Sequence, residues 1–247
     1  MAISKVAVEP EFDAIVAAAG GHLVRSLIDK SPPFDNADYI FHDYKLVAEL
    51  KCVQEDKADD PSTRAKLRRL WIKWRQRRLV SGSVPSSFNS RSLPAACQAE
   101  MYEVMGKPIK RRIQKANKQI RETKAALGIP DYRGVLFIAN DGNFMFPPAA
   151  MIHSIQLSLH RDFREIRHFV FFTANMYLAV RGIGRPVLCW ISFDMDNDKA
   201  SPAETLYDQL YRHWIRRHEE VTGIRADPAE LRDEDMEGFW FANYLRS

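Results

Sequence analysis

The chain has 247 residues, of which 46% are hydrophobic, and its formal net charge is +4. This size and composition support a sizeable core, so we expect one domain, or one domain with a large insertion. No apolar run approaches the ~20 residues that span a bilayer, and residues 1–10 lack the pattern of a signal peptide, which together favour a cytoplasmic protein with no membrane partner.

The first predicted elements are a helix over residues 11–29 and two short strands. Apolar residues recur at helical spacing through the helix, although Gly20-Gly21 weakens its middle, and prolines at 32–33 end it. The strands cover residues 38–42 and 45–53 and are joined by a tight connection.

A helix then follows a polar loop at residues 56–62. Ser62 or Thr63 is the expected cap of this helix, which runs to about Leu79. Residues 81–94 are rich in Ser and Pro and are expected to form a mobile loop.

A second helical pattern covers residues 95–127, with a break expected near Gly106-Lys107-Pro108 and a C-terminal stop at Gly128. The remaining chain alternates between strands and helices and closes on an acidic stretch with an aromatic cluster. Its predicted elements are a strand at 134–140, a helix at 147–160, strands at 167–173 and 186–193, and a helix at 201–222.

Basic residues are concentrated in two segments of the chain. Residues 64–78 hold eight Lys/Arg and no acid, and residues 107–124 hold eight Lys/Arg and one acid, so the rest of the chain is net acidic. Such clustering is typical of a surface that binds a phosphate backbone. The alternative is a pair of solvated helix faces that pair with acids elsewhere in the fold.

The most informative motif lies on the two predicted strands near the N-terminus. Asp38 begins the first strand, and the second carries Glu49-Leu50-Lys51. Side chains alternate across a strand, so Glu49 and Lys51 project to one face and Leu50 to the other. Two carboxylates and a lysine at one strand edge can bind a hard divalent cation and position a water. On an exposed edge strand, Glu-x-Lys would instead be only a solvated pair.

This arrangement resembles the PD-(D/E)xK nuclease superfamily, whose motif is an acid, a variable spacer and acid-x-Lys. Ala37 precedes the acid here where the family pattern has proline. The resemblance covers about residues 11–140 and implies an α/β fold with a restriction-endonuclease-like αβββαβ core and a mixed central sheet. On this hypothesis residues 1–247 form a single nuclease-like domain, with a basic helical insertion at about 56–106 and a C-terminal α/β extension at about 141–247.

The resemblance also implies the chemistry of the site. Asp38, Glu49 and Lys51 would be catalytic, and Mg²⁺, with Mn²⁺ as a substitute, would be held by Asp38, Glu49 and the backbone carbonyl of Leu50. Relatives often add a ligand from the first helix, for which Glu11 is our candidate, with Glu9 and Asp13 as weaker ones. An acid at a helix N-terminus is also explained by the helix dipole alone.

The implied function is a metal-dependent nuclease that hydrolyses DNA with metal-activated water, by analogy in restriction or anti-phage defence. RNA stays open as a substrate, and so does a homodimer or a partner protein. The predicted nucleic-acid contacts are Gln54, Arg68, Arg69, Lys73, Arg75, Lys110, Arg111, Lys115 and Lys118.

Two other classes of protein remain as alternatives. The first is a non-catalytic nucleic-acid-binding or regulatory protein that keeps the nuclease fold. The second is an interaction protein whose basic helices contact an acidic partner, including its own acidic C-terminal region.

Other motifs in the sequence give weaker evidence of function. The three cysteines include no Cys-x-x-Cys pair, and the stretch from Asp194 to Asp198 lacks the glycine and the final glutamate of a calcium loop.

Overall fold

The structure is a computed structural model of the whole chain. The residues that it describes are 5–28, 34–54, 60–85, 92–144, 146–180, 187–195, 203–225 and 243–245.

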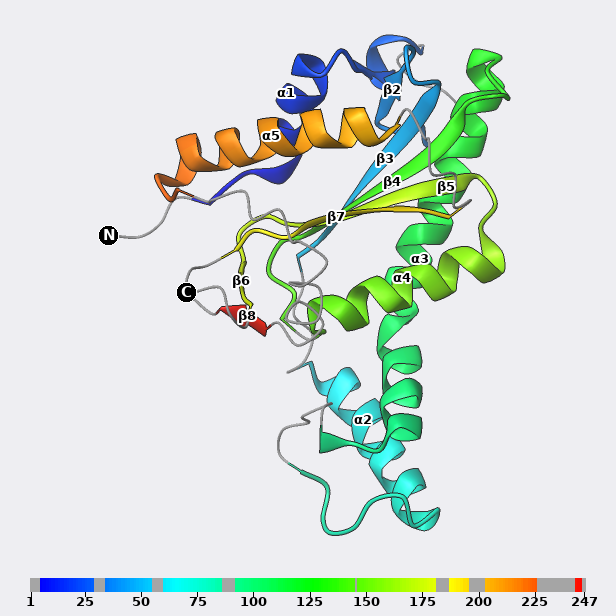
Figure 1. Cartoon of the computed structure of the whole chain (residues 1–247). Coiled ribbons are helices and arrows are strands. Elements are labelled where there is room, and N and C mark those ends of the chain that lie inside the picture. The colour runs from blue at the N-terminus through cyan, green and yellow to red at the C-terminus, as the bar shows by residue number, and fades with distance from the viewer. Residues whose placement is uncertain are drawn as a thin grey trace.

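Six strands form one mixed sheet at the centre of the protein (Figure 1). Their spatial order is β1 (His22–Leu23), β2 (Tyr39–Phe41), β3 (Leu46–Val53), β4 (Arg133–Asn140), β5 (Ile166–Thr173) and β7 (Trp190–Asp194). Strand β2 is antiparallel to both β1 and β3, strands β3, β4 and β5 are parallel, and β7 is antiparallel to β5. The prediction of a mixed α/β fold with a mixed central sheet is confirmed.

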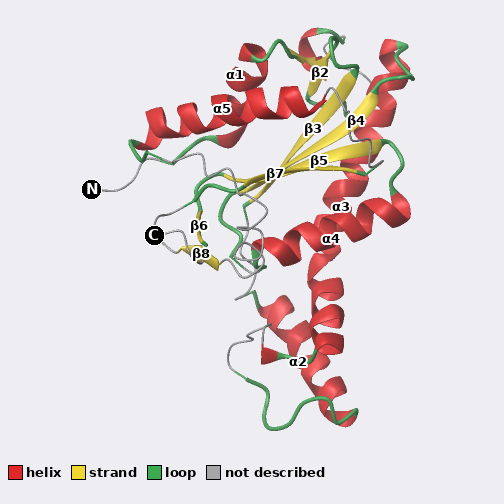
Figure 2. Cartoon of the chain, in the orientation of Figure 1, coloured by secondary structure: helices red, strands yellow, loops and turns green. Residues whose placement is uncertain are grey.

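Helices cover both faces of this sheet, which makes three layers (Figure 2). One face packs against α1 (Val8–Ala18) and α5 (Ala203–Thr222), and the other packs against α3 (Ala95–Leu127) and α4 (Pro148–Asp162). Central strand β4 is buried from Val135 to Ala139, since both of its faces are covered. This explains why β4 reads in the sequence as an unbroken apolar run.

A helical arm extends from the sheet beyond the end of β3 (Figure 1). It consists of α2 (Pro61–Gln76) and the N-terminal half of α3, which pack together through Leu67, Leu70 and the fully buried Trp74. The cap of α2 is Asp60, whose carboxylate accepts a hydrogen bond of 3.0 Å from the Thr63 amide. The prediction of a cap at Ser62 or Thr63 was therefore wrong by two or three residues.

The first helix is shorter than predicted. It ends at Ala18, and the chain then forms β1 and a short 3-10 helix, η1 (Val24–Ser26). Gly20 follows the helix end with φ of 79°, a conformation that favours glycine. Gly21 lies so close to the Phe41 ring that a Cβ atom would be only 2.5 Å from it, so the two glycines are required by the turn into the sheet.

The predicted break in the second helical segment does not occur. Helix α3 is continuous over 33 residues with Pro108 inside it. Met101, Met105, Ile109 and Ile113 are buried in one core on both sides of the proline, and this packing offsets the hydrogen bond that proline cannot make. Residues 95–106 are thus the first half of the core helix rather than a separate inserted helix.

The C-terminal part differs from prediction mainly in an added pair of strands. Strands β6 (Tyr177–Ala179) and β8 (Asn243–Leu245) form a second, antiparallel sheet that was not predicted. The predicted helix cap at Ser201 and most of the acidic C-terminal stretch lie outside the described residues. Within the described ranges, no helix has both the length and the apolar character needed to cross a membrane.

Candidate active site

The β2–β3 hairpin brings Asp38 next to Glu49-Leu50-Lys51. A turn from His42 to Lys45 joins the two strands. The Asp38 amide donates to the Ala48 carbonyl at 3.1 Å, and the Leu50 amide donates to the Asp38 carboxylate at 2.8 Å. The carboxylate of Asp38 therefore lies at the start of β2 and contacts the backbone of Glu49-Leu50-Lys51.

Glu49 and Lys51 point toward α3, and Leu50 packs on the opposite face among residues of the α1–α5 core. The predicted alternation of side chains is confirmed. The ammonium group of Lys51 donates to Glu49 Oε1 and, at 3.0 Å, to Gln119 Oε1 of α3. The three polar groups thus form one chain from the strand to the helix.

Burial sets the electrostatics of the two carboxyl groups. Glu49 is only 1% exposed, and burial together with the charge of Asp38 raises its pKa to about 8 despite the neighbouring Lys51. Burial also raises the pKa of Asp38, opposed by the Leu50 amide and by Lys51. Glu49 Oε2 is buried and has no hydrogen-bond partner among the described residues. An unpaired buried oxygen of this kind is costly.

Gln119 is a site residue that the sequence analysis missed. It is buried, and besides accepting from Lys51 it donates to the Asn36 carbonyl at 2.8 Å. One turn further along α3, the Thr123 hydroxyl accepts from the Ala37 amide at 2.8 Å. Gln119 and Thr123 thus attach the segment before Asp38 to the helix. The sequence signal that could have identified them is the presence of two polar residues, four positions apart, on the otherwise apolar face of this helix.

The residues present fit a small divalent cation. Asp38 and Glu49 supply hard oxygen ligands, and the Glu49 oxygen without a partner is one that a cation would satisfy. The N–H and C=O of a strand residue leave the same edge, so the Leu50 carbonyl is directed to the side of Asp38. No group of three or more His, Cys, Asp or Glu with metal-binding geometry occurs in the described part of the chain. Mg²⁺ is commonly bound by only one or two carboxylates with several waters.

The first helix presents a different acid from the one we favoured. Glu11 forms an ion pair with Arg217 of α5, away from the hairpin. The charges of two other α1 acids, Glu9 and Asp13, contribute to the raised pKa of Asp38. Asp13, however, already forms an ion pair with Arg25 and accepts a hydrogen bond from the Tyr39 hydroxyl. Glu9 is therefore the better placed candidate on this helix.

The predicted nucleic-acid contacts divide into two groups. Near the hairpin, Lys115 pairs with Asp35 at 3.0 Å, Lys118 lies 3.8 Å from Glu122, and Gln54 donates to Asp141 at 3.2 Å. On the arm, Lys73 pairs with Glu100 at 2.7 Å. The other predicted contacts are exposed on α2 and α3, namely Arg68, Arg69, Arg75, Lys110 and Arg111.

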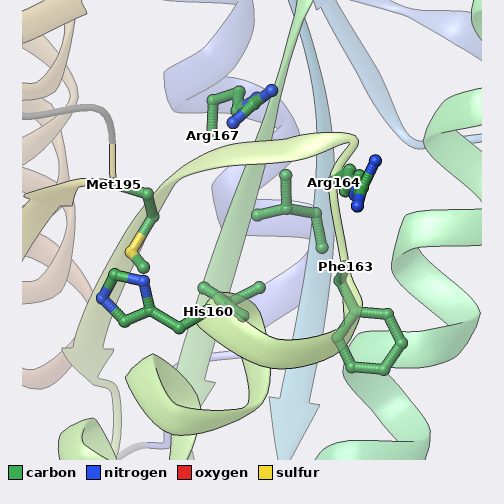
Figure 3. A pocket seen from close by; sticks show the side chains of 7 residues that line it. His160, Phe163, Arg164, Arg167 and Met195 are labelled. Atoms are coloured by element: carbon green, nitrogen blue, oxygen red, sulfur yellow. The ribbon is translucent and has the colours of Figure 1, made fainter.

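A cavity of about 330 Å³ lies elsewhere, between the end of α4, the start of β5 and the end of β7 (Figure 3). His160, Phe163, Arg164, Arg167 and Met195 are among the side chains that line it. Asp38, Glu49 and Lys51 do not line this cavity, so it is separate from the hairpin site.

Comparisons with protein-family models, with curated proteins and with solved structures find no match to this chain.

Proposed function

We propose that this protein is a metal-dependent nuclease that hydrolyses phosphodiester bonds of DNA at the β2–β3 hairpin. The observation that carries the proposal is the buried Glu49, whose second oxygen has no hydrogen-bond partner in the part of the chain that the structure describes, although Asp38 and Lys51 are adjacent. Burial and the charge of Asp38 raise the pKa of Glu49, and a carboxyl group held in this way is typical of a functional site rather than of a structural ion pair.

The order of the elements supports a restriction-endonuclease-like core. Helix α1 is followed by three antiparallel strands, then by the core helix α3, and then by β4, which is parallel to β3. This is the αβββαβ order that the motif implies, with α2 inserted between β3 and α3. The acid-x-Lys segment lies on the third strand and faces the core helix.

The side chains have distinct roles in the proposed reaction. A divalent cation, when bound, would supply a Lewis acid and lower the pKa of a coordinated water. Asp38 and Glu49 would hold it, with the Leu50 carbonyl beside them. The Lys51 ammonium stabilises negative charge that develops on the phosphate. Gln119 orients Lys51 through the 3.0 Å hydrogen bond.

The basic helices supply the electrostatic part of substrate binding. Exposed cations on α2 and on the first half of α3, among them Arg68, Arg75 and Lys110, lie on the arm, and α3 is also the helix that contacts the site. Phosphate contacts of this kind give affinity without sequence specificity and a steep dependence on salt. DNA rather than RNA, a role in restriction or anti-phage defence, and a cytoplasmic location remain predictions by analogy.

The test is cleavage of supercoiled plasmid and of single-stranded DNA with Mg²⁺, Mn²⁺ or EDTA. We expect cleavage that needs the metal and is lost in Lys51→Ala, while Arg121→Ala, an equal loss of charge on exposed α3 surface, retains it. Cleavage that survives Lys51→Ala would contradict the assignment of the site.

A second function is favoured by one observation. Lys51 already neutralises part of the Glu49 charge, as a fold that has lost its metal would require. The protein would then bind nucleic acid without cleaving it. Binding that is equal with Mg²⁺ and with EDTA, together with no cleavage by folded wild type, would establish this alternative.

A further inference from the structure

The face of α3 that meets the hairpin continues beyond the residues that form the site. Lys124 contacts Glu165 at the start of β5, whereas Gln119 contacts Lys51 near the end of β3, so α3 runs antiparallel to β3. Residues seven apart on a helix lie on the same face, two turns from each other. Arg112 therefore lies on the Gln119 face of α3, displaced toward the carboxyl end of β3 and the arm.

Arg112 differs from the other cations of the protein in its surroundings. Among the Lys and Arg side chains that the structure describes, only Lys51, Lys73, Arg112 and Lys124 are partly buried. Three of them pair with a carboxylate, namely Glu49, Glu100 and Glu165 respectively. Arg112 makes no hydrogen bond or ion pair with a described residue, although its side chain is partly buried.

We propose that Arg112 binds a backbone phosphate of the DNA strand that flanks the scissile phosphate on the side of the arm. This assignment rests on the proposed nuclease function for its orientation relative to the cleaved bond. A guanidinium offers two parallel donors to a phosphate, which suits a fixed, partly buried contact better than an ammonium does.

The spacing indicates which phosphate is contacted. Seven helical residues span about 10 Å, and one strand of B-form DNA advances 3.4 Å per nucleotide. Arg112 therefore meets the strand about three nucleotides from the phosphate that Lys51 contacts. The contacted strand continues from the site toward α2, where the exposed cations of the arm take up the phosphates that follow.

The chain offers a matched control on the same helix. Arg121 is nine residues from Arg112, which places it on the opposite side of α3. It is exposed and, like Arg112, makes no hydrogen bond or ion pair with a described residue. Arg121→Ala removes the same charge from the same helix and leaves the face toward the hairpin intact.

The experiment measures binding of a 20-base-pair duplex and of one of its single strands in EDTA, at several salt concentrations. We expect Arg112→Ala to weaken Kd about tenfold and to reduce the slope of log K against log salt by about 0.9 on the duplex. Arg112→Lys should keep the slope but recover only part of the affinity. Arg121→Ala should leave both quantities within about twofold of wild type.

Cleavage in Mg²⁺ separates this inference from the proposed function. We expect Arg112→Ala to raise KM and to leave kcat at saturating DNA unchanged, because the contact is present in the ground state as well as in the transition state. Equal Kd and equal salt slope for wild type and Arg112→Ala would overturn the inference. The role of Arg112 would then be to cover apolar surface with the aliphatic part of its side chain. No cleavage by wild type, with the slope still reduced in Arg112→Ala, would overturn the nuclease proposal and support this contact.

Discussion

The β2–β3 hairpin and the α2–α3 arm use charge in opposite ways. In the hairpin, two acids and one lysine are crowded into a buried place, and each depends on the others. On the arm, many cations are exposed to solvent, and Lys73 and Arg77 share the carboxylate of Glu100. A single change in the hairpin should therefore remove one indispensable step, whereas changes on the arm should act in small, additive amounts that depend on salt.

The largest effect is expected for Lys51→Ala, which we predict to lower kcat for DNA cleavage by about 10²–10³-fold. Removal of one positioned group that stabilises transition-state charge has this size in other enzymes. Single-turnover cleavage at saturating DNA measures it, and circular dichroism serves as the control for folding. A loss below tenfold would remove Lys51 from the chemistry.

The next effect concerns stability and its dependence on pH. The raised pKa means that folded protein keeps a proton on Glu49 from about pH 4.5 up to about pH 8, while the unfolded chain releases it. The contribution of Glu49 to wild-type stability thus falls as pH rises through this window, because the folded state binds a proton that the unfolded chain releases. We expect the free energy of unfolding of Glu49→Gln to decrease less with pH than that of wild type. In EDTA at pH 8.5, the free energy of unfolding of this variant should exceed the wild-type value by about 2 kcal/mol.

Urea unfolding of both proteins at pH 4.5, 6.5 and 8.5 measures this difference. The same variant should lose cleavage, because a neutral amide is a poor ligand for Mg²⁺. A variant that is less stable than wild type at pH 8.5 would show that Glu49 is held as a stabilising ion pair.

A smaller effect is expected for Gln119→Ala. Loss of the hydrogen bond to Lys51 should lower kcat about tenfold, because the ammonium then samples other orientations. Gln119→Glu keeps an acceptor and should recover part of the rate. Gln114→Ala, an exposed change on the same helix, is the control and should leave kcat unchanged.

On the arm, Arg68 and Arg75 are exposed and seven residues apart, so they lie on one face of α2. Each change to alanine should weaken DNA binding a few-fold and reduce the salt slope by about 1. The double variant should lose the sum of the two single-variant changes in binding free energy and in salt slope. Fluorescence anisotropy at several salt concentrations measures both quantities. Non-additive loss, or loss of kcat, would mean that the arm also shapes the site.

The smallest effect separates the acids of α1. Glu11→Gln should change cleavage less than twofold, because Glu11 pairs with Arg217 away from the hairpin. Glu9→Gln should lower cleavage more, because the charge of Glu9 acts on Asp38. Metal titrations of the two variants compare them directly, and a larger loss in Glu11→Gln would restore our first choice of ligand.

Several features of the protein were determined by the sequence alone, because they depend on local pattern. Alternation along β3 placed Glu49 and Lys51 on one face, apolar continuity identified β4, and Gly128 ended α3 as expected. These features follow from strand pleating, from burial on both faces and from the left-handed conformation that glycine allows.

Only the tertiary structure decided the features that depend on long-range packing. Buried contacts on both sides of Pro108 kept α3 whole, and after α1 the chain turns into the sheet through Gly20, at φ of 79°, and Gly21, which packs against the Phe41 ring. Gln119 and Arg112 became site candidates only once the structure placed α3 beside the hairpin. Gln119 is 68 residues away from Lys51 in the sequence, so no local pattern could connect the two. Local sequence contains the period of each element, but the partners of a buried polar group are set by which elements pack together.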